Sequence, residues 1–166
     1  MSNPDRSLEF VRIRDILPTD SNDIVSISTT GRCICGVMID LVNSVRDIRA
    51  GSKSSAVSVI ESESGVAGVV VISLSGRLTP KFGITIAIRS GVDAGAALSL
   101  VTNVMTTVVR QHYGRGWLVC DAPESDPSTS HRMTSNNWLQ TMTNRGGMRR
   151  YVLPIGDSNA TEEQDT

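Results

Sequence analysis

The sequence has no excess of positive charge and almost no lysine. Its 166 residues include 16 Lys and Arg and 17 Asp and Glu, which gives a net charge of −1. Only Lys53 and Lys81 are lysines, and no physical reason links this preference for arginine to a function. A protein dedicated to nucleic-acid binding is expected to be basic overall. The composition therefore argues against that class of protein.

Cysteine is scarce and occurs in an odd number. Cys33, Cys35 and Cys120 are the three cysteines, and the first two are too close in sequence for a common disulfide. A Cys-x-Cys pair with one distant cysteine and two scattered histidines is also a weak pattern for zinc. We therefore expect buried thiols in a reducing compartment, rather than a disulfide framework, and no bound metal.

Long apolar runs are missing as well. None approaches the roughly 18 residues that a membrane-spanning helix needs, and the polar, charged N-terminus does not resemble a signal peptide. We predict a cytoplasmic protein, or one of the host cytoplasm or the virion if the source is viral. Hydrophobic residues make up 39% of the chain, enough for one domain with a real core. We expect a flexible lead at 1–7, a single domain at 8–153 and an acidic disordered tail at 154–166.

The most informative stretch runs from Lys81 to Gly114 and predicts a strand, a tight turn and a long helix. Large apolar residues alternate with small or polar ones over 82–89, which is the period of a strand with one buried face. A stripe at steps of three and four predicts the inward face of the helix: Ala94, Ala97, Leu98, Val101, Val104, Met105 and Val108. The glycine-rich link RSGVDAGAA leaves the first N–H groups of the helix free for an anion, although a plain structural turn explains the same residues.

The segment 29–51 allows two interpretations. Cys33, Cys35 and Val37 alternate with other residues as in a strand, whereas a longer apolar stripe that begins at Ile34 fits a helix. We predict a helix, with glycines as weak points inside it. Before this segment we expect a strand at 8–13 and a short helix after Pro18, with Ile24 and Ile27 inward. After it we expect a meander of strands at 55–61, 66–74 and 82–89, and then the long helix. The remaining elements are a strand at 117–120 parallel to its neighbour, a loop at 121–132, a helix at 134–144 and a strand at 148–153.

In this order the elements resemble those of the GNAT superfamily of N-acetyltransferases. LEFVRIRDILPTDSNDIVSI is similar to the family's opening strand and first helix, and ITIAIRSGVDAGAAL to its fourth strand, phosphate loop and main helix. SNNWLQTMTNRGGM is similar to its late helix. The resemblance implies an α/β fold of the mixed α+β kind, GNAT-like, with a central, mostly antiparallel sheet of six or seven strands flanked by helices.

The resemblance implies acetyl-CoA as a substrate, bound at the strand, loop and helix of residues 82–110. The family binds it in a notch where the fourth and fifth strands splay apart, here 82–89 and 117–120. The pantetheine arm would pair with the backbone of Ile86 to Ile88, and the pyrophosphate would lie on N–H groups of Val92 to Ala97. The implied cofactor-binding residues are Ile86, Ile88, Val92, Gly95, Ala96, Ala97 and Asn136.

The sequence departs from the family's pattern where the chemistry would take place. The family's loop usually begins with glutamine or arginine, where this chain has Val92. Asp93 would add a negative charge beside the phosphates, at a cost on the order of 1 kcal/mol, but it is explained better as a helix-start residue. The tyrosine that often protonates the leaving thiolate falls on Thr143, whose hydroxyl is a poor general acid. The weak catalytic candidates are Thr143, Tyr151 and Glu61.

Two functions of different classes follow. The first is an acyl-CoA-dependent N-acetyltransferase, in which an amine attacks the bound thioester and a backbone N–H near Ile88 stabilises the oxyanion. The second is a catalytically inactive GNAT-like binding or assembly protein, for example a viral or phage structural protein, that acts through protein–protein contacts or as a homo-oligomer. The small-residue loop favours the first, and the departures at Val92 and Thr143 favour the second. Arginines in the C-terminal third would also suit nucleic acid or an acidic partner, but a solvated face explains them better.

Overall fold

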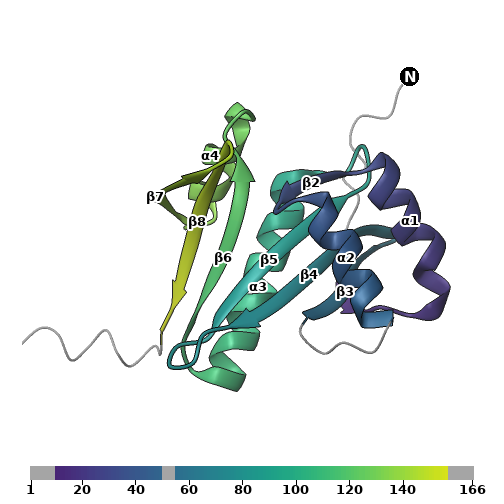
Figure 1. Cartoon of the computed structure of the whole chain (residues 1–166). Coiled ribbons are helices and arrows are strands. Elements are labelled where there is room, and N and C mark those ends of the chain that lie inside the picture. Colours follow the sequence, from purple (N-terminus) through teal and green to yellow (C-terminus); the bar gives the residue numbers. More distant parts are fainter. Residues whose placement is uncertain (1–9, 50–54, 157–166) are drawn as a thin grey trace, which may run out of the picture.

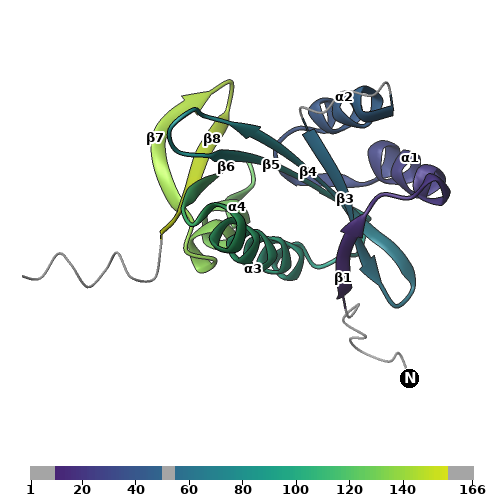
Figure 2. The ribbon, with the colours of Figure 1, turned by 90° about the horizontal axis from the view of Figure 1, so that it is seen from below.

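A computed structural model describes residues 10–49 and 55–156 of the chain and shows one mixed sheet between two layers of helices (Figure 1). In Figure 2, α3 and α4 lie on one side of the sheet, and α1 and α2 lie on the other. The elements in chain order are β1 (Phe10–Asp15), the 3-10 turn η1 (Pro18–Asp20), α1 (Ser21–Thr30), β2 (Arg32–Cys35), α2 (Met38–Arg49), β3 (Ser55–Ser62), β4 (Gly65–Ser75), β5 (Lys81–Ile88), α3 (Ala94–Tyr113), β6 (Gly116–Pro123), α4 (Pro127–Ser135), β7 (Leu139–Arg145) and β8 (Met148–Ile155).

The strands join in the order β1-β3-β4-β5-β6-β8-β7, and β2 pairs with β5 beside this path. Among the described strands, β5 and β6 are parallel and the other pairs are antiparallel. The mostly antiparallel sheet flanked by helices confirms the predicted fold class. The meander β3–β4–β5 and the parallel crossover through α3 are also as predicted. β5 and β6 share a register only over Lys81–Gly83 and Trp117–Val119, so the two strands diverge beyond that point.

Two apolar clusters fill the space between the sheet and its helices. The larger lies on the α3 side, where Phe82, Ile84, Ile86 and Ile88 of β5 are all buried, as their alternation predicts. The smaller lies under α1 and α2, where Ile24 and Ile27 are buried as predicted. The α3 residues that are buried are Ala94, Ala97, Leu98, Val101, Thr102, Met105 and Val109. The predicted inward residues Val104 and Val108 are only partly buried.

The single helix predicted for residues 29–51 is wrong. α1 ends at Thr30, β2 occupies Arg32–Cys35, and α2 begins at Met38. Both interpretations of the pattern are therefore partly right, each over a different part of the segment. Gly36 has φ of +78°, a left-handed conformation that ends the strand and that other residues adopt only at a cost.

The helix predicted for residues 134–144 is also wrong. A helix, α4, forms earlier, in the predicted loop, because Pro127 opens it and the Asp126 side chain caps the backbone N–H of Ser128 at 3.0 Å. The chain then enters β7, and Gly146 and Gly147, with φ of +57° and +76°, make the turn into β8. Trp138, between α4 and β7, is a core residue. β8 continues to Ile155, and residues 1–9, 50–54 and 157–166 lie outside the described residues.

A partly buried ion pair ties β1 to the start of α1. The Asp20 carboxylate accepts hydrogen bonds from the Arg14 guanidinium at 2.8 and 2.9 Å and from the Leu17 backbone N–H at 2.7 Å. These donors, and the Arg14 hydrogen bond above all, hold the pKa of Asp20 below its ordinary value of 3.8. A carboxylate with a lowered folded-state pKa stabilises the fold above its ordinary pKa and loses that contribution as the pH falls through its folded-state pKa.

We expect Asp20→Asn to lower the free energy of unfolding by about 3 kcal/mol at neutral pH, because the variant removes the nearest counter-charge of Arg14. The difference from the wild type should shrink in acid, at pH values below the lowered pKa of Asp20. Urea unfolding of both proteins at neutral and at acidic pH measures this. A difference that does not depend on pH would contradict the assignment.

Candidate functional site

The strand β2 lies in the notch between β5 and β6. Beyond Gly83, β5 no longer pairs with β6, and its edge on that side is taken by β2. The pairs are Arg32 with Ile88, Cys33 with Ala87, and Cys35 with Ile86, all antiparallel. Figure 1 shows β5 and β6 diverging and β2 beside the far end of β5. The chain therefore fills its own notch with a short strand.

β2 is also fastened to β6 on the other side of the notch. Cys35 and Cys120 form a disulfide across it, with their Cα atoms 5.8 Å apart. The backbone N–H of Gly36 donates to the Asp121 carbonyl oxygen at 2.6 Å. The expectation of free buried thiols is therefore wrong for two of the three cysteines. Distance in sequence concealed the pair, since 85 residues separate the two positions and only the fold brings them together.

The third cysteine is free. Cys33 lies in β2, and its side chain is partly buried against the cluster under α1 and α2. Burial, with a smaller contribution from the Asp40 charge, raises the pKa of Cys33 to about 11. Because the thiolate is the reactive form, Cys33 is a poor nucleophile at neutral pH.

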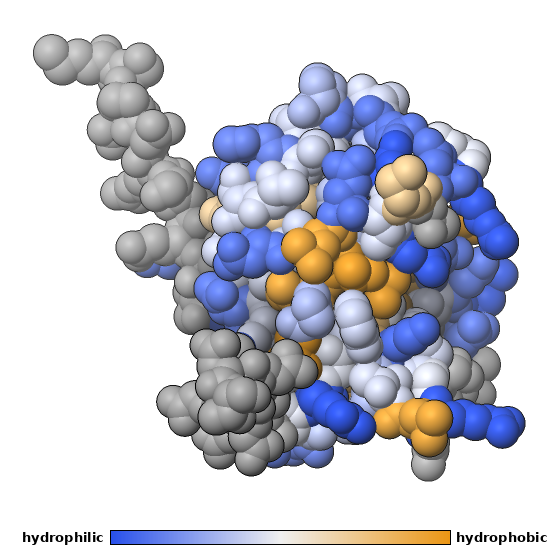
Figure 3. Space-filling view, turned by 90° about the vertical axis from the view of Figure 1, so that its left-hand side faces the viewer, coloured by the Kyte–Doolittle hydropathy of each residue, from blue (hydrophilic) through white to orange (hydrophobic). Residues whose placement is uncertain are grey.

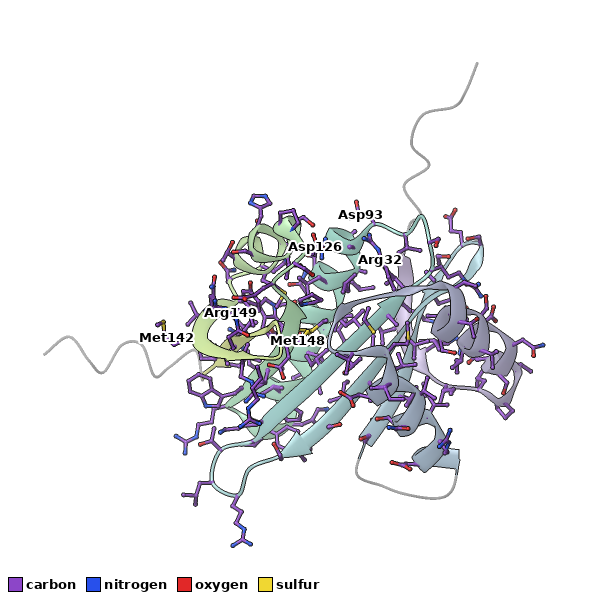
Figure 4. All side chains as sticks on the ribbon, turned by 45° about the horizontal axis from the view of Figure 1, so that its top comes forward. Arg32, Asp93, Asp126, Met142, Met148 and Arg149 are labelled. Atoms are coloured by element: carbon purple, nitrogen blue, oxygen red, sulfur yellow. A yellow bond between two sulfur atoms is a disulfide. The ribbon has the colours of Figure 1, made fainter. Side chains whose placement is uncertain are left out.

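The start of α3 is capped by the chain itself. The Asp93 carboxylate accepts the backbone N–H of Ala96 at 3.0 Å, which confirms Asp93 as a helix-start residue. The Ala97 N–H donates to the Asp93 carbonyl oxygen at 3.0 Å, and the Val92 side chain is buried. The N–H groups of Ala96 and Ala97, which the sequence assigned to a pyrophosphate, are thus already bonded to Asp93. The Asp93 carboxylate lies where the pyrophosphate would be. Figure 4 labels Asp93, which lies at the N-terminal end of α3.

Arg89 directly follows β5, and its side chain contacts α1 and β4. Its guanidinium donates to the Val66 carbonyl oxygen at 2.6 Å and to Ser26 Oγ at 3.1 Å, and it pairs with Asp23. All three partners lie on α1 and β4. Arg89 therefore connects α1 to the sheet, which is a structural role.

Acetyl-CoA does not fit the notch as it is arranged here. The β5 edge that would pair with a pantetheine arm is paired with β2, and the helix start that would hold the pyrophosphate carries the Asp93 carboxylate. Small residues do remain in the first turn of α3, where a Cβ added to Gly95 would meet only the Asp93 side chain, at 3.4 Å. The assignment of the predicted set to a cofactor stays a prediction: Ile86, Ile88, Val92, Gly95, Ala96, Ala97 and Asn136.

The structure does not bring the three catalytic candidates together. Glu61 lies on β3 and pairs with Arg12 at 2.8 Å and Arg14 at 3.3 Å, and these bonds, the Arg12 hydrogen bond first, lower its pKa. A general base that works at neutral pH needs the opposite shift. Tyr151 is buried in the cluster on the α3 side, and Thr143 lies in β7 rather than on a helix. Asn136, at the end of α4, donates from its side chain to the Arg132 carbonyl oxygen at 2.9 Å.

An open cleft of about 640 Å³ lies beside the filled notch, on the side of the sheet that α1 and α2 cover only in part. Its floor is the sheet surface of β4, β5 and β6, where Val71, Gly83 and Val119 lie beside the hydroxyl side chains of Ser73 and Thr85. One wall is α2 with its preceding turn, and the other is the hairpin of β7 and β8. The lining residues with polar side chains are Asp40, Asn43, Ser44, Ser73, Thr85, Asp121, Arg145 and Arg150.

The charges in the cleft differ between its two walls. Asp40 lies on the α2 wall and Arg145 on the hairpin wall, and within residues 10–49 and 55–156 neither is in a salt bridge. Arg150 is held in place by Asp121, which accepts from its Nε at 2.9 Å and its Nη2 at 3.1 Å. Asp121 therefore fixes the Arg150 guanidinium at the cleft through Nε and Nη2, and the Nη1 group does not bond to Asp121.

Sequence reasoning missed this cleft because its walls come from segments about 100 residues apart. Arg145 and Arg150 were noticed only as part of a basic C-terminal third. In the structure two other arginines of the C-terminal third pair with carboxylates, Arg149 with Glu124 and Arg132 with Asp126. Figure 3 shows the side of the molecule on which β7 and β8 lie, with apolar residues at its centre and hydrophilic ones around them. It is not a uniformly basic surface of the kind that nucleic acid requires.

Two features are absent from the described part of the chain. No group of three or more His, Cys, Asp or Glu side chains there is arranged to hold a metal ion. No helix there is long and apolar enough to cross a membrane.

Comparison with known proteins identifies the fold. The chain is similar to the spermidine N-acetyltransferase of Vibrio cholerae in complex with CoA and spermine (TM-score 0.60, 10% identity, 86% of this chain and 94% of that chain). It is also similar to a GNAT superfamily phosphinothricin acetyltransferase of Sinorhizobium meliloti in complex with acetyl-CoA (TM-score 0.61, 14% identity, 93% of each chain). A third is the N-acetyltransferase PseH of Campylobacter jejuni (TM-score 0.60, 9% identity, 88% of this chain and 99% of that chain).

The chain therefore has the fold of the GNAT acetyltransferases, as the sequence motifs indicated. No family model and no curated protein matches the sequence. At 9–14% identity, the agreement is one of architecture. What the chain does must be argued from its own notch and cleft.

Proposed function

We propose that this chain is a GNAT-fold binding protein that does not transfer acetyl groups in its disulfide-bonded form. The observation that carries the proposal is the pairing of β2 with Ile86–Ile88, which fills the notch where this fold would hold an acyl donor. The capped start of α3 supports it, since the Asp93 carboxylate would repel a pyrophosphate. The cleft between α2 and the β7–β8 hairpin is open to a ligand.

The cleft suits a small molecule that carries both an amino group and a carboxylate. Its volume of about 640 Å³ lies in the usual range for small-molecule sites. Asp40 on one wall would receive an ammonium group, and Arg145 with Arg150 on the other would receive a carboxylate. The apolar side chains of the floor, Val71 and Val119, would pack against the carbon chain between the two charged groups. Amino acids and short peptides have this chemistry.

An acyl-CoA-dependent N-acetyltransferase is the second candidate. It is supported by the small residues Gly95, Ala96 and Ala97 in the first turn of α3 and by the similarity to two acetyltransferases solved with CoA or acetyl-CoA. Calorimetric titration of the disulfide-bonded protein with acetyl-CoA decides between the candidates. Saturable heat in that form would favour the transferase, and its absence would favour the binding protein.

For the cleft itself, we expect calorimetric titration with a panel of L-amino acids and dipeptides to find a saturable ligand. Asp40→Asn and Arg145→Gln should each weaken that ligand by about 10- to 100-fold, because each removes one charge-assisted contact. Asp47→Asn and Arg115→Gln are matched controls, since both residues are exposed and neither lines the cleft. A zwitterion site would be refuted if Asp40→Asn and Arg145→Gln bind the ligand as the wild type does, or if no compound of the panel binds.

A further inference from the structure

We propose that the Cys35–Cys120 disulfide is a redox latch that holds β2 in the notch, and that its reduction lets β2 leave and exposes the Ile86–Ile88 edge of β5. The inference rests on the proposed function in one respect, namely that β2 closes the notch. The proposal of a latch adds what keeps the notch closed and what opens the notch. The open edge would take an extended ligand, for which acetyl-CoA is the probe.

The covalent bond crosses the notch and joins β2 to β6. Cys35 ends β2, and Cys120 lies in the middle of β6. The Cα atoms of bonded cysteines cannot lie more than about 7 Å apart, so β2 cannot leave β6 while the bond is intact. The disulfide therefore excludes the open arrangement, whatever other contacts β2 makes.

The remaining contacts of β2 are few. The strand has four residues, and three register pairs join it to β5. The Gly36 N–H bond to the Asp121 carbonyl is the hydrogen bond at its far end. Ile34 is its one large apolar side chain in the main cluster. A strand this short, flanked by Gly31 and Gly36 at its two ends, belongs to the part of the fold that opens at low cost once the bond is gone.

Of the four β2 residues, only Cys33 packs against the cluster that lies under α1 and α2. α1 and α2 are held to the sheet by the cluster that contains Ile24, Ile27, Leu41 and Val45. Release of β2 therefore leaves both helices in place and moves the link between them. The cleft lies directly beside this link, since Gly36 and Asp121 both line it. Opening the latch would join the notch to the cleft in one continuous site.

The redox step balances with a dithiol as the reductant. One thiolate of the dithiol attacks a sulfur of the Cys35–Cys120 bond and forms a mixed disulfide, and the other protein sulfur leaves as a thiolate and takes up a proton. The second thiol of the reductant then resolves the mixed disulfide, which yields the second protein thiol and the oxidised, cyclic reductant. Cys35 Sγ lies 3.3 Å from the Ile84 carbonyl oxygen, which can accept a hydrogen bond from the new thiol. Both sulfurs are buried, so the reaction requires local opening and should be slow.

The test is amide hydrogen exchange of the full chain before and after dithiothreitol. Reduction should raise the exchange rate of residues 32–35 and 86–88 by about tenfold or more and leave the β3–β4 pair unchanged. Cys35→Ser should exchange like the reduced wild type without any reductant, because its hydroxyl can still donate to Ile84. Cys33→Ala is the matched control and should respond to reduction as the wild type does, since Cys33 is free and its raised pKa keeps it unreactive.

Acetyl-CoA then reports on the exposed edge. We expect binding to the reduced protein and to Cys35→Ser at least about tenfold tighter than to the oxidised protein, with renewed protection of residues 86–88. Unchanged exchange of β2 after complete reduction would overturn the latch while the proposed function stands. If the oxidised and reduced forms bind acetyl-CoA with equal, measurable affinity, both the latch and the proposed function are overturned. Faster exchange without acetyl-CoA binding would overturn the assignment of an extended acyl-CoA ligand to the exposed edge.

Discussion

Gly31→Ala should lower the free energy of unfolding by about 3 kcal/mol and loosen β2 at the same time. A Cβ at this position would lie 2.4 Å from the Ile88 carbonyl oxygen and 2.6 Å from that of Ile27. Both neighbours are backbone atoms, one in β5 and one in α1, so no side chain can turn aside to make room. The clash can be relieved only if β2 moves away from β5 or α1 moves away from the sheet.

Urea unfolding measures the loss, and hydrogen exchange at residues 32–35 locates it. Gly95→Ala is the matched control, because its new Cβ would meet only the Asp93 side chain, at 3.4 Å, and it lies inside α3. Alanine is the better helix former, so this control should gain up to about 1 kcal/mol. If Gly31→Ala is as stable as the wild type, the close approach of β2 to β5 is not a feature of the protein.

Trp138→Ala should be the most destabilising single substitution that we propose, at about 4 kcal/mol. Trp138 is 1% exposed and lies where the chain leaves α4 for β7. Its ring belongs to the main cluster, and its Nε1–H donates to Thr102 Oγ1 of α3 at 3.1 Å. The substitution therefore opens a cavity and leaves a buried hydroxyl without its donor.

Trp117→Ala is the matched control, since the other tryptophan is 38% exposed and should cost about 1 kcal/mol or less. Trp138→Phe separates the two effects, because it keeps most of the packing and loses only the hydrogen bond to Thr102. Chemical unfolding followed by circular dichroism compares all three with the wild type. Equal losses for Trp138→Ala and Trp117→Ala would show that Trp138 does not pack in the core.

Most of the sheet and its main helix could be predicted because their signals are local. The alternation of Phe82 to Ile88 and the stripe from Ala94 to Met105 are periodic patterns that a strand and a helix require of their own residues. The order of elements then restricted the topology, because a strand that follows a helix returns beside an earlier strand as a parallel neighbour. The resemblance to the acetyltransferases was carried by residues 84–98, which lie within these patterns, and by the segments 8–27 and 135–148.

The two wrong helix predictions lie where periodic signals compete. In residues 29–51 the pattern fits a helix over more positions than a strand, and the choice of β2 depends on the free edge of β5, which the sequence does not display. In residues 134–144 the apolar positions Trp138, Leu139 and Met142 fit a helix face. Only Trp138 is buried in the structure, whereas Leu139 and Met142 are 56% and 94% exposed. Figure 4 shows Met142 on the outer side of β7.

By itself, then, the sequence determined the fold class, the position of the strand, loop and helix at 82–113, and the role of Asp93 as a helix cap. The last two depend on residues within a few positions of one another, and the fold class depends on the order of the elements along the chain. Only the tertiary structure decided that β2 fills the notch, that Cys35 meets Cys120, and that Asp40 faces the same cleft as Arg145. Those contacts join positions that are 50 to 105 residues apart, and a linear sequence carries no record of which distant backbone edge or charge a residue will meet.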